Sequence, residues 1–370
     1  MNESFGSLGL VVMAALAAAL GDQELALARG TETRFAVPSA EYRTIQEAID
    51  RVPDGATLDI APGVYRENLS IAGKRLRIAG ASGPGPRTEI VAADEARAVI
   101  AYGSGGGGAL QDLALRGGTF GVLAEAGSRT GGDVELTIRR LTIRQTGSGV
   151  YGRFSKLELE DSRIVATESH SVVLLFCGVY CSVKDAFVSN AGGAGLYVAN
   201  EAAGGAVCDP ETGASLCIHD SAFVANEGGG IMIIGGAKPV SIRHSWALAN
   251  RFGGILLWGG SDVTIDETEA SGSLPLDDGR FGDGIVAVLT PNLVVTDSIT
   301  DSNARSGVAA FGSTIGLGGN WSVCNAFDMN YETFAGIPGN FVKLADNTCG
   351  CVGDPCQALS SGLEAPPALP

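Results

Sequence analysis

Short apolar runs separated by glycine and polar turns occupy most of the chain. In its central part a glycine directly precedes an apolar strand, and a second apolar strand follows. These glycine-led strands begin at Gly121, Gly149, Gly195, Gly230, Gly254, Gly284 and Gly307, and Ser171-Val172 is a further copy without its glycine. The pattern indicates a repeat of about 22 to 24 residues with insertions. Asparagines lie in the turns after the second strand, at Asn190, Asn226, Asn250 and Asn303.

A repeat of this length holds two or three strands that are too short to bury their own apolar faces. Successive repeats must therefore stack to make a continuous core. We expect an all-β fold, a single parallel β-solenoid, in which stacked asparagines bond along the axis and glycines permit the tight bends. A leucine-rich repeat is disfavoured because no helix fits inside the unit.

One amphipathic helix is expected before the repeats. In residues 42–52, Thr44 and Glu47 have the spacing of a capping box, and Ile45, Ala48 and Ile49 lie on one apolar face. The sequence therefore predicts a short helix at the start of the coil.

The first residues have the features of an export signal. Residues 5–20 form an apolar run of signal-peptide length, and residues 26–28 offer a small-x-small cleavage site. We expect a signal peptide over 1–28 and a secreted, periplasmic or cell-surface protein with no stable membrane span after cleavage. Because no Lys or Arg precedes the run, an upstream start or a buried helix is the alternative.

The cysteines suit the same compartment. All eight fall into three local groups: Cys177 with Cys181, Cys208 with Cys217, and Cys324, Cys349, Cys351 and Cys356. Their spacing lacks paired zinc-ligand motifs, so disulfides are the better interpretation, with the connectivity left open.

The charge balance excludes two classes of partner. The 25 Lys plus Arg against 41 Asp plus Glu give a formal net charge of −16. An acidic chain of this kind is unsuited to nucleic acid or to anionic membranes.

A family resemblance supports the coil. The segment 44–50, TIQEAID, with Pro53, Gly55, Ile60, Pro62-Gly63, Tyr65, Glu67 and Ile71 after it, resembles the opening of right-handed parallel β-helix proteins of the pectin-lyase-like superfamily, notably pectin methylesterases and periplasmic repeat proteins. The resemblance implies that the helix caps a β-helix over 42–314. A Cys-rich segment over 315–357 would then cap or flank the other end, and 358–370 would form a disordered tail.

The same resemblance implies polysaccharide as the ligand, without fixing an activity. The methylesterase aspartate pair, the polygalacturonase Asn-Thr-Asp and Gly-His-Gly motifs and the epimerase Asp-Pro-His motif are absent. Fold alone does not grant a function.

A basic column is the preferred site. If Ile218 and Ile242 point inward, then Lys184, His219 and Arg243 point outward on adjacent strands, with Asp220 and His244 beside them. Such cations could hold a uronate carboxylate while His219 or His244 acts as base in β-elimination or epimerisation. The alternative is a solvated strand face whose charges pair with one another.

A calcium site is the second candidate. Asp277, Asp278 and Asp283 surround Arg280 in a glycine-rich insertion, and Ca²⁺ prefers carboxylate oxygens. The spacing is not that of an EF-hand, and an acidic surface turn is the alternative. No other cofactor is indicated. The regularly spaced acids Asp112, Asp161, Asp185, Asp220 and Asp297 are interpreted as turn-closing residues.

An apolar stripe is expected on the outward side of the glycine-led strands. It would include Tyr197 and Trp258, on which a sugar ring could stack, and it is too large to stay exposed on a monomer. Its cover would be the tail after residue 315, the loop around Cys208, a second subunit in a homo-oligomer, or a glycan.

Together these observations predict an exported β-helix protein that binds an extracellular, uronate-containing polysaccharide, with lyase-type processing as the activity if it is an enzyme. A non-catalytic surface or structural protein acting through protein contacts is the alternative, and the enzyme status stays open.

Overall fold

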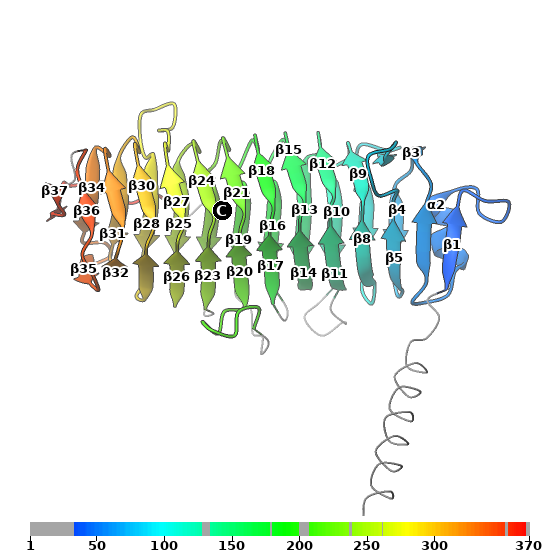
Figure 1. The fold of residues 1–370 in the computed structure, drawn as a ribbon, viewed down its shortest axis with the longest axis horizontal. Coiled ribbons are helices and arrows are strands. Elements are labelled where there is room, and N and C mark those ends of the chain that lie inside the picture. Colours follow the sequence, from blue (N-terminus) through cyan, green and yellow to red (C-terminus); the bar gives the residue numbers. More distant parts are fainter. Residues whose placement is uncertain are drawn as a thin grey trace, which may run out of the picture.

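Three long parallel sheets make up the molecule. The computed structural model describes residues 33–127, 134–177, 180–199, 207–236, 239–260, 262–351 and 354–367. Its sheets A, B and C contain 13, 13 and 12 strands, which wind into a solenoid of about twelve turns (Figure 1). The predicted all-β parallel solenoid is confirmed, and the signal peptide expected over 1–28 lies outside the described residues.

Each turn contributes one strand to each sheet. Sheet A consists of β1 (Arg34–Val37), β2 (Thr57–Ile60), β5 (Arg75–Ala79), β8 (Gly107–Gln111), β11 (Val134–Arg139), β14 (Ser155–Glu160), β17 (Cys181–Lys184), β20 (Leu216–His219), β23 (Val240–Arg243), β26 (Val263–Asp266), β29 (Leu293–Thr296), β32 (Thr314–Gly318) and β35 (Asn340–Lys343). Sheet B consists of β3 (Gly63–Arg66), β6 (Thr88–Val91), β9 (Leu113–Arg116), β12 (Thr142–Arg144), β15 (Arg163–Val165), β18 (Phe187–Ser189), β21 (Ala222–Val224), β24 (Trp246–Leu248), β27 (Glu269–Ser271), β30 (Ile299–Asp301), β33 (Trp321–Val323), β36 (Thr348–Cys349) and β37 (Asp354–Pro355). Sheet C consists of β4 (Leu69–Ile71), β7 (Ile100–Tyr102), β10 (Phe120–Glu125), β13 (Ser148–Arg153), β16 (Val172–Leu175), β19 (Leu196–Ala199), β22 (Ile231–Ile234), β25 (Gly253–Trp258), β28 (Asp283–Val288), β31 (Ser306–Phe311), β34 (Phe327–Glu332) and β38 (Ala358–Leu359).

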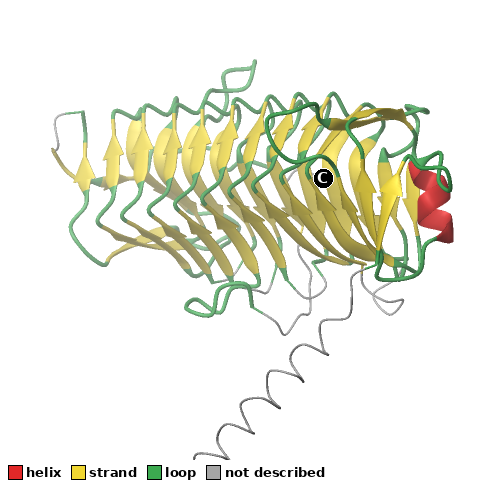
Figure 2. Cartoon of the chain, turned by 45° about the vertical axis from the view of Figure 1, so that its right-hand side comes forward, coloured by secondary structure: helices red, strands yellow, loops and turns green. Residues whose placement is uncertain are grey.

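The core follows from strand alternation. Like residues stack in register, as Ile218 pairs with Ile242 and Ile242 with Ile265, and all three are fully buried. The glycine-led strands of the sequence form sheet C and the second strands form sheet A. The strands of sheet B in the middle of the coil have three residues each and carry the weakest periodic pattern (Figure 2).

An asparagine ladder lies at the corner between sheets B and C. The Asn226 amide donates to Asn250 Oδ1 at 2.9 Å, and Asn303 makes the same bond to Asn325 at 2.8 Å. The predicted ladder is therefore present, but it follows the short strands of sheet B rather than the second strands, which form sheet A, and Asn190 is not part of it. Ala191 occupies that position, and its N–H donates to Asn226 Oδ1. Asn190 is exposed one residue earlier, in a left-handed conformation with φ 55°.

The glycines beside the ladder are needed for close stacking rather than for a bend. A Cβ at Gly230 would lie 2.5 Å from the carbonyl oxygen of Gly254 in the next turn and 2.8 Å from the Asn250 amide. A side chain at this position would push successive turns apart.

Left-handed residues form the corner between sheets A and B. Asp112, Asp161, Asp185, Asp220 and Asp297 all have φ between 47° and 56°, and His244 and Glu267 adopt the same conformation in neighbouring turns. Asp tolerates this region better than most residues because its short polar side chain can bond locally. The recurring acids are therefore explained by the backbone of the turn.

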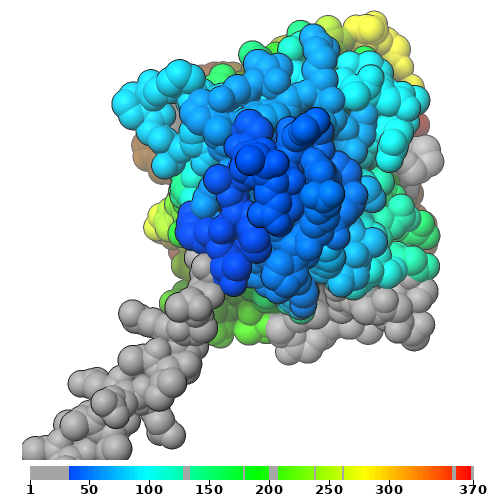
Figure 3. Space-filling model, turned by 90° about the vertical axis from the view of Figure 1, so that its right-hand side faces the viewer, coloured from blue at the N-terminus to red at the C-terminus, as the bar shows by residue number. Residues whose placement is uncertain are grey.

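The N-terminal end is closed by α2 (Ile45–Arg51) and β1. Thr44 Oγ1 accepts from the Glu47 N–H at 3.1 Å, while the Glu47 carboxylate accepts from Arg43. The Glu67 carboxylate caps the first turn, and Lys74 Nζ donates to three carbonyls of the last turn. Figure 3 views this end, where the first described residues cover the coil.

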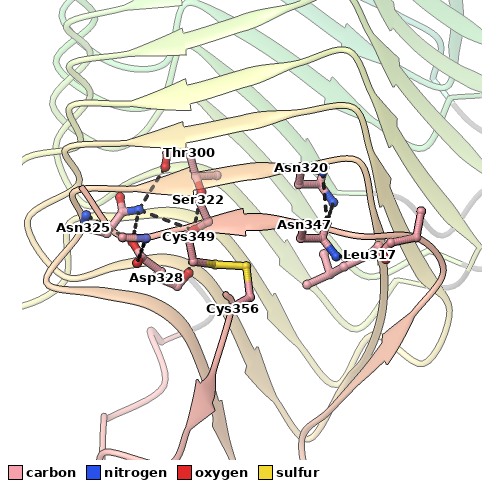
Figure 4. The surroundings of a disulfide bond; sticks show 11 residues. Thr300, Leu317, Asn320, Ser322, Asn325, Asp328, Asn347, Cys349 and Cys356 are labelled. Atoms are coloured by element: carbon pink, nitrogen blue, oxygen red, sulfur yellow. Dashed lines mark hydrogen bonds between the residues drawn. A yellow bond between two sulfur atoms is a disulfide. The ribbon is translucent and has the colours of Figure 1, made fainter. Parts of the chain in front are cut away.

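The coil continues beyond residue 314. Strands β32, β35 and β36 extend sheets A and B, and β36 turns back into the antiparallel β37. The Cys349–Cys356 disulfide lies inside this last turn, beside the bonds of Asn325 and Asn347 (Figure 4). Cys324–Cys351 is the second disulfide there.

Residues 358–367 are built into the fold, which corrects this part of the disordered tail expected over 358–370; residues 368–370 lie outside the described residues. β38 pairs with β34, and residues 360–367, here called the C-terminal strap, run on over sheet C. The Glu332 carboxylate accepts from the N–H groups of Ser361, Gly362 and Leu363 at 2.8, 2.7 and 3.2 Å. These bonds hold the strap because they use backbone donors that would otherwise need water.

The strap helps to cover the apolar stripe. This second apolar cluster lies on the outer side of sheet C, separate from the core, and comprises Val173, Ala194, Tyr197, Met232, Phe252, Leu256, Phe281, Val286, Val288, Ala309 and Phe311. Leu363 and Ala365 of the strap and Leu276 of the 275–282 loop pack against it. The chain itself, including the segment after residue 315, therefore supplies cover for the stripe.

Among the described residues, none of the helical structure has the length and apolar character that crossing a bilayer requires.

Candidate functional site

The predicted basic column lies on the outer face of sheet A. The pairing register puts Lys184 beside His219 and His219 beside Arg243, as alternation predicts. The loop that carries Cys208, held by the Cys208–Cys217 disulfide, lies over this face because Cys217 is itself an outward residue of β20. The column and the loop together form the candidate site.

Arg243 is occupied by carboxylates. Its guanidinium lies 3.0 Å from Glu211 and 3.8 Å from Asp209, both in the Cys208 loop, and 3.6 Å from Asp266 on the next strand. The hydrogen bond that Arg243 donates to the Glu211 carboxylate raises the pKa of Arg243. The protein's own carboxylates therefore neutralise Arg243. This is the alternative in which the charges of the strand face pair with one another, and Arg243 is not free to bind an anion.

His219 is half-buried and held by a polar chain. Its Nε2 lies 3.1 Å from Ser241 Oγ, and Ser241 donates to Asp209 at 3.2 Å. Burial lowers the pKa of His219, with Asp209 acting in the opposite direction. The ring is therefore neutral near pH 7, and one of its nitrogens is engaged.

Asp220 and His244 lie at the corner between sheets A and B, where both have left-handed backbones. His244 contacts Glu267 through Nε2, and its Nδ1 is 3.8 Å from Asp220. These side chains pair with one another along the corner instead of converging with His219 on one substrate position.

A pocket beside Lys184 is the part of this face that stays open. It has a volume of about 240 Å³ and is lined by Glu158, Leu159, Glu160, Tyr180, Ser182, Lys184, Val207 and Cys208. The Cys177–Cys181 disulfide fixes the loop that carries Tyr180, and the Cys208–Cys217 disulfide fixes the opposite wall. Two cross-linked loops thus set the shape of the pocket.

Opposite charges converge at its floor. The Tyr180 hydroxyl donates to Glu158, whose other oxygen accepts from Thr137 at 3.1 Å. Lys156 Nζ lies 3.4 Å from Glu158 and 4.6 Å from the centre of the Tyr180 ring. Burial alone would raise the pKa of Glu158, but the hydrogen bonds from Tyr180 and Thr137 lower it overall. The hydrogen bond to Glu158 raises the pKa of Tyr180.

Lys184 is the exposed cation at the rim. Its side chain is 50% exposed, and its ammonium lies 3.9 Å from Asp185, beyond hydrogen-bond distance. Glu160 beside it is held by Arg139 at 2.6 Å. The pocket therefore offers an exposed ammonium to a ligand, beside a carboxylate and a phenol that are already bonded to each other.

A larger groove, of about 440 Å³, lies at the corner between sheets A and B and is lined by Arg87, Arg140 and Arg163 among others. Arg140 is held by two hydrogen bonds to Asp112, at 2.7 and 3.0 Å. The groove lies outside the predicted column.

The expected calcium site is not formed. Asp283 is fully buried and bound by Arg305 through both oxygens, whereas Asp277 contacts Arg251 and Asp278 contacts Arg280. Within the described part of the chain no three acidic, His or Cys side chains gather in a metal-binding arrangement. Each carboxylate has an arginine in place of a metal.

The two aromatic residues proposed for substrate binding belong to the covered stripe. Tyr197 is 8% exposed and stacks on His170 with 4.8 Å between ring centres. Trp258 packs edge-on against Phe334 at 5.7 Å. Tyr197 is therefore buried away from a sugar ring, and Trp258 is half-buried against the stripe.

Sequence reasoning missed the floor of the pocket. Alternation in LELE at 157–160 directs Glu158 outward together with Glu160, and the spacing of Cys177 and Cys181 places Tyr180 in a short closed loop. These two signals could have found the pocket, but the contact between Tyr180 and Glu158 depends on the stacking of β14 and β17.

Comparison with known proteins agrees with the architecture. The family model described as right handed beta helix region matches residues 114–270 and 173–348. No curated protein matches the chain in sequence.

Solved structures share the fold at low identity. The A-module of the Azotobacter vinelandii mannuronan C-5 epimerase AlgE6 is 18% identical, with a TM-score of 0.53 over 88% of this chain and 95% of that one. The AlgE4 A-module is 16% identical, with a TM-score of 0.56 over 86% and 95%. The catalytic domain of a GH87 α-1,3-glucanase is 13% identical, with a TM-score of 0.57 over 87% of this chain and 65% of that domain. These structural neighbours are carbohydrate-active enzymes.

Proposed function

We propose that this chain, which belongs to the right-handed β-helix family, is an extracytoplasmic protein that binds a uronate-containing polysaccharide on the outer face of sheet A. The observation that carries the proposal is the pocket between two disulfide-closed loops, with Lys184 at its rim and Tyr180 and Glu158 at its floor. Structural neighbours that act on mannuronan and on α-1,3-glucan support the ligand class.

The groups in the pocket suit a sugar acid. The Lys184 ammonium can pair with a uronate carboxylate. Because the rest of the molecule is acidic and repels anions, this lysine makes the pocket selective for a negatively charged sugar. The Glu158 carboxylate can accept from sugar hydroxyls, and the Tyr180 ring can pack against a pyranose face.

The pocket supports binding better than lyase-type processing. Removal of the proton next to a uronate carboxylate needs a base whose pKa is near the working pH. The pKa of Tyr180 is raised by Glu158, and the pKa of Glu158 is lowered by its donors. His219 has a suitable neutral ring, but Ser241 engages it and the Cys208 loop adjoins it. Catalysis would require this loop to move.

The disulfides support the proposed compartment. All four pairs that the cysteines form are intramolecular, at 177–181, 208–217, 324–351 and 349–356. Such cross-links persist in secreted and periplasmic proteins and are rare in the reducing cytosol.

Binding of pectate, alginate and neutral glycans to the wild-type protein and to Lys184→Ala tests the proposal, with and without Ca²⁺. We expect the wild-type protein to bind uronans and the variant to bind them roughly tenfold more weakly, because the variant loses one partly desolvated ion pair. The absorbance of unsaturated uronate is followed in the same samples, and Ca²⁺ should change neither signal.

Lys343→Ala is the matched control, because Lys343 is an exposed lysine of the same sheet, paired with Asp346 at the far end of the coil. Equal losses in the two variants would mean non-specific charge attraction. Unsaturated product that disappears in His219→Ala would establish a lyase. The absence of any uronan binding would refute the proposal and favour a structural protein.

A further inference from the structure

A line of exposed aromatic and apolar side chains follows the outer face of sheet B, where the strands lie side by side along the top of Figure 1. The register pairs Phe187 with Ala222, Ala222 with Trp246, Trp246 with Glu269, Glu269 with Ile299, and Ile299 with Trp321. These six residues, here called the sheet B column, therefore occupy one position on successive strands.

The column points outward. Trp246 is 42% exposed, Ile299 42% and Trp321 58%, whereas the residues that follow them in each strand, Ala247, Thr300 and Ser322, are buried. Large exposed side chains that recur on one face mark an interaction surface more often than chance exposure does. Neither the C-terminal strap nor the Cys208 loop covers this face, because their contacts are with sheets C and A.

The spacing favours a linear polymer as the ligand. At about 4.8 Å per strand, Phe187 and Trp246 are roughly 10 Å apart, and Trp246 and Trp321 roughly 14 Å apart. An extended glycan advances per sugar residue by a length similar to this strand spacing, so the exposed rings of Trp246 and Trp321 can each meet a pyranose face of one chain. The Phe187 ring is half-buried, and the Arg163 guanidinium lies over one of its faces, 4.6 Å from the ring centre.

Charge decides which kind of glycan fits. Glu269 lies between Trp246 and Ile299, and Asp301 ends the neighbouring strand on the same side. These carboxylates can accept hydrogen bonds from sugar hydroxyls. Glu158 and Glu160 of the sheet A pocket have Lys156 and Arg139 as partners, whereas Glu269 has Trp246 and Ile299 beside it in the register, so the column repels a polyuronate.

The geometry points to the sheet B column as a second binding site, one that takes a neutral, linear polysaccharide by stacking on Trp246 and Trp321. This site does not depend on the uronate site of sheet A, since the two lie on different faces and one selects an anionic glycan whereas the other selects a neutral one. It would anchor the protein to a neutral glycan while the sheet A pocket faces another ligand.

Tryptophan fluorescence tests the site directly. The sequence has three tryptophans, and two of them lie on the column, whereas Trp258 is half-buried against the stripe of sheet C. The full protein is titrated with cello-, laminari-, xylo- and nigero-oligosaccharides of increasing length. We expect a blue shift, protection from acrylamide quenching, and affinity that rises until the chain spans the column.

Each of Trp246→Ala and Trp321→Ala should weaken this binding by roughly three- to tenfold, the loss of one stacked ring. Tyr331→Ala, which removes an exposed aromatic residue at the end of the coil outside sheet B, should leave it unchanged. Lys184→Ala should also leave it unchanged, so failure of this site and failure of the sheet A site give different patterns.

Three results would overturn the inference. The first is an absence of neutral-glycan binding while circular dichroism confirms the fold. The second is binding that survives in the double variant Trp246→Ala/Trp321→Ala. The third is sedimentation that reveals self-association abolished by the same double variant, which would make the column an interface between copies.

Discussion

Single residues on the outer faces are mostly neutralised by close partners. Arg243 has three carboxylates around it, and Asp283 is bound by Arg305 and by the Ser306 N–H at 3.0 Å. Arg243 and Asp283 were candidates for catalysis and metal binding in the sequence, and in the structure they form ion pairs between turns of the coil. Lys184 differs because its side chain is 50% exposed and lies 3.9 Å from its neighbour Asp185, and Trp246 and Trp321 differ because they are exposed.

Half-buried histidines make stability depend on pH. Burial lowers the folded-state pKa of both His170 and His219 below the unfolded value, which is about 6.5. As the pH falls through about 6.5, the unfolded chain binds protons that the folded chain does not bind. The contribution of these neutral histidines to the free energy of unfolding is therefore complete above that pH and is lost progressively below it. We expect the urea midpoint to decrease from pH 7.5 to pH 5.5, and less steeply in His170→Gln/His219→Gln. Parallel profiles for the two proteins would contradict this assignment.

Turns of the coil are joined as elements by buried amide bonds. Asn250 Oδ1 accepts from the Asn226 N–H and side-chain amide, at 3.0 and 2.9 Å, while its own amide donates to the Phe223 carbonyl. Every turn therefore contributes bonds as well as apolar contacts to its neighbours, in the manner of a one-dimensional array.

Loss of one ladder residue should be costly. Asn250→Ala leaves two buried donors and one acceptor without partners, and we expect the free energy of unfolding to fall by about 2–4 kcal/mol. Guanidinium denaturation measures the change. Asn190→Gly is the matched control, because Asn190 is exposed and left-handed, and its replacement should alter stability by no more than about 0.5 kcal/mol. Similar losses in both variants would argue against the ladder.

At the scale of the whole molecule, the chain's last residues return to cover an outer face. The strap is held by Glu332 and by a bond from Arg305 to the Glu364 carbonyl at 2.8 Å. Pro366 is buried, which shows that the strap is seated on the stripe. The coil thus hides on sheet C the type of surface that it leaves open on sheet B.

Truncation after Ser360 should uncover the stripe. We expect stronger binding of the dye ANS, self-association in sedimentation, and a loss of about 2 kcal/mol of stability from the apolar area exposed. Leu359→Ala changes an exposed apolar residue just before the strap and should produce none of these effects. An unchanged monomer without dye binding would mean that the 275–282 loop alone covers the stripe.

The sequence by itself determined the coil. Periodic apolar strands, glycine and asparagine at one corner and a capped helix at the start are local features, and stacking of equivalent positions follows from the repeat. It also located Lys184, His219 and Arg243 on one face, because strand alternation fixes the side of each residue.

Only the tertiary structure decided what each face presents. Whether Arg243 is free depends on where the Cys208 loop lies, and whether Tyr197 is exposed depends on the packing of its neighbours. The sequence also placed Asn190 in the ladder, but the structure puts Ala191 at that position and Asn190 one residue earlier. An asparagine suits both the ladder and the adjacent left-handed position, so its presence alone does not distinguish them. Loops and the terminal strap carry no periodic signal, so their contacts across turns decide which side chains remain available to a ligand.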